Sequence, residues 1–80
     1  MNLYLIKQST HLEYDTYDAA VVAASSESDA KLIHPAGREV QWGEYQCDWV
    51  SDPNDVEVTY IGVAAASIER GVVLASFNAG

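Results

Sequence analysis

Residues 19–24 (AAVVAA), followed at once by residues 26–35 (SESDAKLIHP), decide the fold of this chain. The six apolar residues have the length of a strand, and a run without alternation is typical of a strand buried on both faces. The second stretch starts with a serine suited to cap a helix and with carboxylates favoured in the first turn, and Pro35 ends it. A two-turn helix is unstable alone. We therefore expect it to lie on the alanine-rich strand, with Ala30 and Ile33 inward.

Further strand candidates flank this pair. Residues 3–6 are a short apolar run, and residues 56–61 (VEVTYI) alternate between apolar and polar side chains, as a strand with one covered face does. Residues 40–42 and 47–50 are two short strand candidates around a Gly-Glu turn, and residues 72–77 (VVLASF) are the last candidate. Gly, Pro, Asn and Asp clusters between these runs predict turns.

Together these elements predict one α+β domain over residues 1–80. We expect a small, mostly antiparallel sheet of about five strands, in the order β-β-α-β-β-β, with one short helix packed on one face. The other face is left to water or to a second copy of the chain. Trp42, Trp49 and the five tyrosines are more aromatic surface than one small core hides easily, so we expect a homo-oligomer.

The charge balance excludes several classes of partner. The chain has four Lys and Arg residues and twelve Asp and Glu residues, which gives a net charge of -8. A nucleic-acid interface needs clustered cations, and an anionic membrane attracts them too. Lys7, Lys31, Arg38 and Arg70 are scattered singly, so neither partner is expected.

The compartment is expected to be the cytoplasm. The single cysteine, Cys47, cannot form an internal disulfide, and the chain opens without a charged and then apolar leader. The longest nearly apolar run, residues 19–24, is far too short to span a membrane.

Residues 14–18 (YDTYD) are the most distinctive polar stretch. Two tyrosines, Tyr14 and Tyr17, are each followed by a carboxylate, Asp15 and Asp18. Tyrosine rings give contact area at low entropic cost and carboxylates accept hydrogen bonds, which suits a protein contact or a ligand with a base and sugar hydroxyls. The alternative is that a tyrosine caps the core and the aspartates face water.

Other polar residues have weaker signals. His11, Glu13 and Asp15 alternate as metal ligands on an extended segment would, but a solvated loop explains them better. His34 is explained by the dipole at the end of the predicted helix. Arg38, with Lys7, is the candidate to bind the phosphate of an anionic ligand.

No motif predicts catalysis or a cofactor. The sequence lacks a Walker loop, a G-x-G-x-x-G loop and a His-Glu-x-x-His pair, and Cys47 has no cationic neighbour to activate it. We expect a protein that is not an enzyme, with no metal and no cofactor.

Three segments resemble a family of small tailed-bacteriophage proteins: residues 14–24 (YDTYDAAVVAA), residues 33–35 (IHP) and residues 71–80 (GVVLASFNAG). The resemblance covers nearly the whole chain, including Trp42-Gly43 and residues 56–62. It implies a counter-defence protein in the cytoplasm of the host cell, with no established chemistry attached.

Two specific routes follow from that resemblance, and a third stays open, in which the chain is an accessory phage protein that docks on a host or phage partner for another purpose. In the first, the protein is a sponge, an oligomer that binds and sequesters a nucleotide-derived immune signalling molecule. The side chains expected to bind it are Tyr14, Asp15, Tyr17, Asp18, His34, Arg38, Trp42 and Asn78. In the second, the acidic surface mimics nucleic acid and inhibits a host defence protein, as anti-CRISPR proteins do, through carboxylates between Glu39 and Glu57. We favour the sponge, because mimicry needs the acids on one face and the sequence does not show this.

Overall fold

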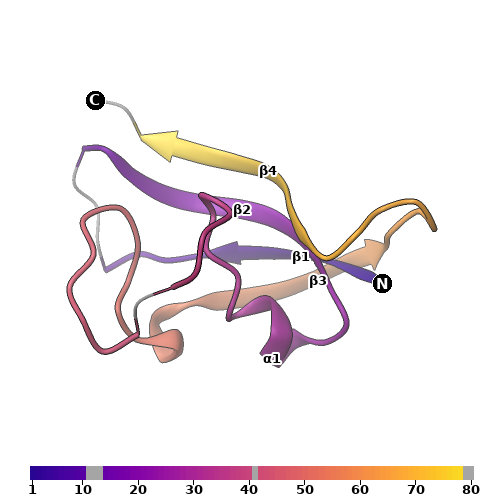
Figure 1. Ribbon diagram of the computed structural model, residues 1–80, viewed down its shortest axis with the longest axis horizontal. Coiled ribbons are helices and arrows are strands. Elements are labelled where there is room, and N and C mark those ends of the chain that lie inside the picture. Colours follow the sequence, from indigo (N-terminus) through magenta and orange to yellow (C-terminus); the bar gives the residue numbers. More distant parts are fainter. Residues whose placement is uncertain (11–13, 41, 79–80) are drawn as a thin grey trace.

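The computed structural model describes residues 1–10, 14–40 and 42–78 of the chain (Figure 1). The elements are the strands β1 (Asn2–Lys7) and β2 (Thr16–Ala24), the helix α1 (Glu27–Ala30), the 3-10 turn η1 (Pro53–Asp55), and the strands β3 (Glu57–Val63) and β4 (Gly71–Asn78). The accessible surface is 4760 Å². This agrees with the ~4,700 Å² expected for a compact chain of this mass.

The four strands form one antiparallel sheet in the order β3-β1-β2-β4, so β3 and β4 are its edges. The α+β class, the antiparallel sheet and the single short helix are confirmed. The prediction of about five strands is wrong, since the sheet has four among the described residues.

The two central strand candidates are the source of this error. Residues 47–49 form bends and Val50 is irregular, so no strand forms here, and Val40 and Trp42 also lie outside the sheet. Trp49 and Val50 are both buried although they are consecutive. A strand would send them to opposite faces, whereas here both insert into the core.

The helix is shorter than the sequence pattern predicts. Ser26 caps it as expected, since its hydroxyl accepts a hydrogen bond from the Asp29 N–H, but the helix ends at Ala30. Beyond it, the N–H of Ile33 donates to the Ala30 carbonyl, three residues back. Pro35 disfavours the helical conformation of the residue before it. Ala30 and Ile33 are still buried, as predicted.

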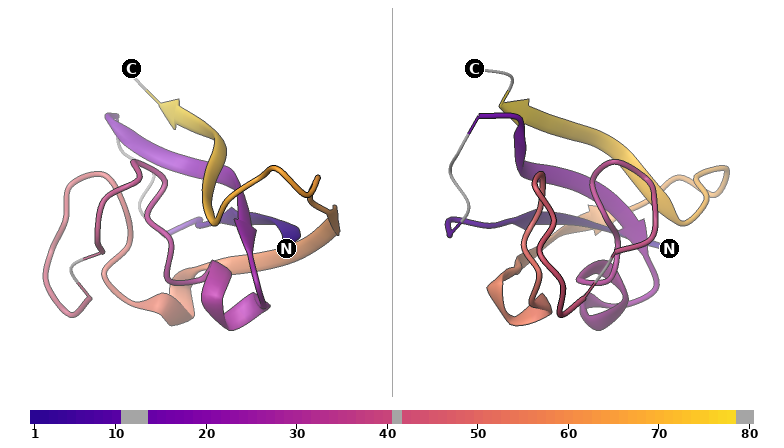
Figure 2. Two further views of the ribbon diagram at one scale, coloured as in Figure 1. Left: turned by 45° about the vertical axis from the view of Figure 1, so that its right-hand side comes forward. Right: turned by 60° about the vertical axis from the view of Figure 1, so that its left-hand side comes forward.

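One face of the sheet carries the core. Tyr4 and Ile6 of β1 and Ala20 and Val22 of β2 are buried there. The cover is α1, which lies against β1, β2 and β3, together with the long loop from residue 31 to residue 56. Trp49 of this loop is fully buried and belongs to the core. The loop and α1 together thus form the second layer that covers this face of the sheet (Figure 2).

No helix or long loop of the described residues covers the opposite face in this way, and we name it the open face. Strand alternation places Leu3, Leu5, Ala19, Val21 and Leu74 on it, since Leu5 pairs with Val21 and Val21 with Leu74. Leu3, Leu5, Ala19 and Val21 are half-buried, and Leu74 is 69% exposed. On this side of β2, Ala23 is fully buried whereas Ala19 and Val21 are half-buried, so the expectation that β2 is buried on both faces is met in full only on the covered side.

Candidate functional site

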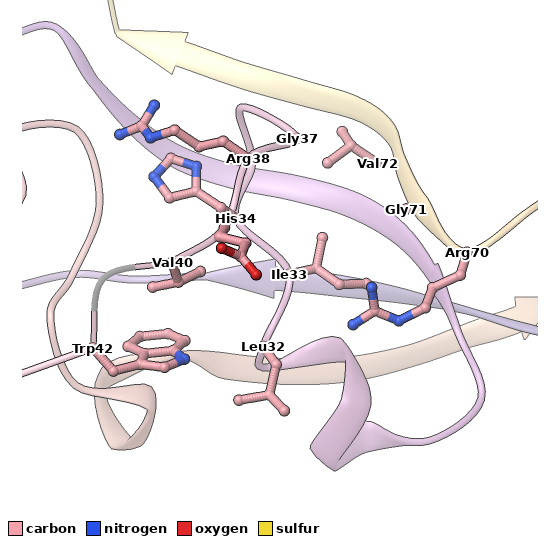
Figure 3. A pocket seen from close by; sticks show the side chains of 11 residues that line it. Leu32, Ile33, His34, Gly37, Arg38, Val40, Trp42, Arg70, Gly71 and Val72 are labelled. Atoms are coloured by element: carbon pink, nitrogen blue, oxygen red, sulfur yellow. The ribbon is translucent and has the colours of Figure 1, made fainter.

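A hollow of about 730 Å³ lies between the loop that follows α1 and the start of β4 (Figure 3). We name it the His34 hollow. It brings together residues 32–40 and 42 with residues 70–72, which are distant in the sequence. Its lining consists of Leu32, Ile33, His34, Gly37, Arg38, Glu39, Val40, Trp42, Arg70, Gly71 and Val72.

A tight turn after the helix shapes one wall of the hollow. The Gly37 N–H donates to the His34 carbonyl at 2.9 Å, and Gly37 has φ of +83°, a left-handed conformation that glycine adopts without a steric penalty. The turn reverses the chain after Pro35. Arg38 is thereby returned toward the 46–50 part of the loop.

His34 is the buried centre of this wall. Its Nδ1 accepts a hydrogen bond from the Ala36 N–H at 2.9 Å, which places the proton of the neutral ring on Nε2. Nε2 lies 3.3 Å from Asp48 Oδ1, within ion-pair distance but not aligned as a hydrogen bond. The ring also contacts Tyr17 and Trp49, with centroids 6.1 and 6.4 Å away.

These surroundings lower the pKa of His34. Burial is the main cause, and the positive charge of Arg38 adds to it, while Asp48 and Gln46 act in the opposite direction. The imidazole is therefore neutral at pH 7. Its side chain has no exposed surface, so its role is to support the wall of the hollow from behind. The predicted place of His34 at a helix C-terminus is wrong, since the helix has already ended.

Arg38 and Asp48 form an ion pair beside His34. Arg38 Nη2 lies 2.7 Å from Asp48 Oδ1, and the arginine side chain is 51% exposed. Burial raises the pKa of Asp48, but the hydrogen bond from Arg38 and the neighbouring charges outweigh it, and the net effect is a lowered pKa. The bond with Asp48 also raises the pKa of Arg38. The pair holds a cation at the rim of the hollow.

A second pair stands at the other end of the hollow. Arg70 Nη2 lies 2.9 Å from Asp29 Oδ1, and Arg70 Nε contacts both oxygens of the same carboxylate, at 2.9 and 3.1 Å. Hydrogen bonding to Arg70 is the largest cause of the lowered pKa of Asp29. Figure 3 shows the Arg38 and Arg70 side chains at opposite ends of the hollow, with Trp42 along its side.

The candidates named from the sequence divide into two groups. His34, Arg38 and Trp42 line the hollow. Tyr17 lies behind it, with its ring against His34 and against Phe77, whose centroid is 4.8 Å away.

The remaining candidates lie outside the hollow. The Asp15 N–H donates to the Asn78 carbonyl at 2.5 Å, so these two residues meet where β2 begins and β4 ends. Tyr14 is 72% exposed, and Asp18 is also exposed. None of these four residues lines the hollow.

Sequence reasoning missed the carboxylates Asp29 and Asp48 and the cation Arg70 as parts of this site. Arg70 and Asp29 are 41 positions apart, and no local pattern links them. Only the β4 strand, which starts beside α1 in space, brings Arg70 to the hollow.

Two other expectations concern metal and membrane. In residues 1–10, 14–40 and 42–78, no three His, Cys, Asp or Glu side chains come together as metal ligands. His11 and Glu13, which alternate with Asp15 as metal ligands would, lie outside these ranges. Within the same part of the chain, no helix has the length and apolar character needed to cross a membrane.

Comparisons of the chain with protein-family models, with curated proteins and with solved structures yield no significant match.

Proposed function

We propose that this protein is a non-catalytic counter-defence protein of bacteriophage type that binds and sequesters a nucleotide-derived immune signalling molecule in the His34 hollow. It would act in the cytoplasm of the host cell, without a cofactor. One observation carries the proposal: Arg38 and Arg70, two of the four cations of a chain with net charge -8, stand at the rim of one hollow beside Trp42.

The two arginines suit phosphate groups. A guanidinium has five N–H donors, and each carboxylate partner engages only part of them. The side chains are 51% and 47% exposed, so the remaining donors are accessible to a ligand. Because the arginines lie at opposite ends of the hollow, a ligand with two separated phosphates, such as a cyclic dinucleotide, would contact both.

The side of the hollow suits a base. Trp42 is half-buried and packs against the core, so its ring is held in place while part of it faces the hollow. Stacking of a base on an aromatic side chain contributes about 1–3 kcal/mol. The exposed carboxylate of Glu39 is available to accept hydrogen bonds from sugar hydroxyls.

The experiment is a panel of cyclic dinucleotides, cyclic trinucleotides and cyclic ADP-ribose isomers, incubated with the purified protein. We expect one class to raise the melting temperature and to be released intact when the protein is denatured by heat. Trp42→Ala and Arg70→Ala should weaken this binding at least tenfold, whereas Lys7→Ala, which removes a cation outside the hollow, should not. A panel without any stabilising member would overturn the proposal.

A second candidate function is the acidic mimic of nucleic acid. No lysine or arginine lies between Arg38 and Arg70 in the sequence. Glu44, Asp55 and Glu57 in this interval are exposed. If mimicry operates, a basic defence effector should bind the chain in a salt-sensitive manner, and Glu44→Gln with Asp55→Asn and Glu57→Gln should weaken binding. Arg70→Ala should then have no effect, which separates the two functions.

A further inference from the structure

The open face of the sheet is mostly apolar, as a surface buried in an interface would be. In an antiparallel sheet with one solvated face, the outward side chains are usually polar. Here the outward positions of the two central strands are Leu3, Leu5 and Lys7 of β1 and Ala19, Val21 and Ala23 of β2, and all but Lys7 are apolar. Leu74 continues this apolar surface onto β4.

A shallow hollow of about 270 Å³ marks the centre of this surface. Leu5, Val21 and Leu74 line it, one from each of three neighbouring strands. The other lining residues are alanines and a serine of β2 and β4: Ala19, Ala20, Ala75 and Ser76. None of the seven is charged, in a chain whose net charge is -8.

We infer that the open face is the interface of a homodimer, in which the sheets of two copies pack face to face around a twofold axis. Two apolar faces complement one another, and burial of Leu5, Val21 and Leu74 against their symmetry mates removes them from water. Electrostatic repulsion between the copies is limited here, because the lining of the central hollow carries no carboxylate. Lys7 and Glu57, which alternation places at its margin, are a cross-strand pair of opposite sign.

The available area suits such a dimer. Four strands spaced ~4.8 Å apart, with about six residues each at ~3.3 Å per residue, present a face of roughly 400 Å² in projection. Because side chains protrude from this plane, the accessible surface that two copies would bury together comes close to the ~1,000 Å² that a specific interface needs. The dimer is therefore expected to be reversible, with a dissociation constant on the order of micromolar rather than nanomolar.

The edge strand β4 offers a competing arrangement. Its residues, GVVLASFN, include no charge, and an open edge can pair with the same edge of a second copy. However, the register of β4 shifts beside Val73, between the Val22 and Val21 pairings, which disturbs the ladder that a partner would extend. Edge pairing would also leave the apolar open face in water. We therefore place the interface on the face.

The test measures association by sedimentation velocity, without any nucleotide, from about 1 to 200 µM around the expected micromolar constant. The variants are Leu5→Lys, Leu74→Lys and the control Tyr45→Lys, whose side chain is 77% exposed on the covering loop. Each makes the net charge less negative, so dissociation cannot be caused by greater general repulsion. We expect the unchanged chain and Tyr45→Lys to dimerise, and both leucine variants to weaken the dimer at least tenfold.

Each other outcome is decisive. A chain that stays monomeric throughout this range overturns the inference. If Leu74→Lys dissociates the dimer and a folded Leu5→Lys does not, copies pair through the β4 edge. Because Leu74 is mostly exposed, we expect Leu74→Lys to remain folded. If Leu5→Lys unfolds, Val21→Thr is used in its place. The dimer does not depend on the proposed ligand, so a dimer that binds no nucleotide refutes only the proposed function.

Discussion

His34 Nε2 lies 3.3 Å from Asp48 Oδ1, inside the loop that covers the sheet. This contact ties the turn after α1 to the 46–50 part of the loop, and Arg38 joins it from the solvent side with a 2.7 Å contact to the same oxygen. The Tyr17 N–H donates to the Asp48 carbonyl at 2.9 Å, so the cluster is also attached to β2. One carboxylate thus organises both the cover of the core and the wall of the hollow.

The stability of the fold should fall as the pH falls below neutrality. The pKa of His34 is lowered in the folded state from 6.5, mainly by burial. The unfolded chain therefore binds more protons below pH 6.5, so the stabilisation is complete above 6.5 and is lost as the pH falls toward the folded pKa. Urea unfolding at pH 8, 7, 6 and 5 measures this slope. It should flatten in His34→Gln; an unchanged slope in this variant would contradict the assignment.

Loss of Asp48 should destabilise the chain more than loss of an exposed carboxylate. Asp48→Asn removes the partner of Arg38 and the carboxylate beside the His34 ring. We expect about 1–2 kcal/mol lower free energy of unfolding, toward the smaller value because Arg38 is half-exposed. Since Asp48 raises the pKa of His34, that pKa should fall further in Asp48→Asn, as NMR titration of the ring would show. Glu44→Gln, with an exposed side chain, is the matched control and should change neither quantity.

The two tryptophans should have distinct fluorescence and distinct energetic roles. Trp49 is fully buried and Trp42 is half-buried. A Trp42→Phe chain, which keeps Trp49, should emit at shorter wavelength than a Trp49→Phe chain. Trp49→Ala should cost ~3–5 kcal/mol, enough to unfold much of a domain this small. Equal emission maxima in the two single-tryptophan chains would show that Trp49 is not in the core.

The helix cap should contribute measurably although α1 has only four residues. Ser26 accepts a hydrogen bond from the Asp29 N–H at 3.2 Å. Ser26→Ala is expected to lower the free energy of unfolding by about 1 kcal/mol, and Ser26→Asp, which can still cap, by much less. Thermal unfolding of the two variants distinguishes capping from a general effect of substitution at this position. Equal losses in both would mean that the cap contributes nothing.

Local patterns were sufficient for the regular elements of the fold. The runs at residues 3–6, 19–24 and 72–77 lie within strands of the structure, as do residues 57–61 of the run 56–61, and the serine cap of the helix is in place. In each case the information lies within a few adjacent residues. The same reasoning failed for residues 47–50. A short apolar run predicts a strand, but a loop inserted into a core has the same pattern, and here Trp49 and Val50 are consecutive and both buried.

The sequence by itself determined the α+β class, the acidic surface and the apolar character of both faces of the central strands. These properties depend on composition and on a period of two residues. Only the tertiary structure decided that Arg38 and Arg70 share one hollow, that Asp48 pairs with Arg38 beside the His34 ring, and that one apolar face stays open. Such relationships join residues 10 to 41 positions apart. They are set by the strand order β3-β1-β2-β4 and by the path of the covering loop, which no local pattern specifies.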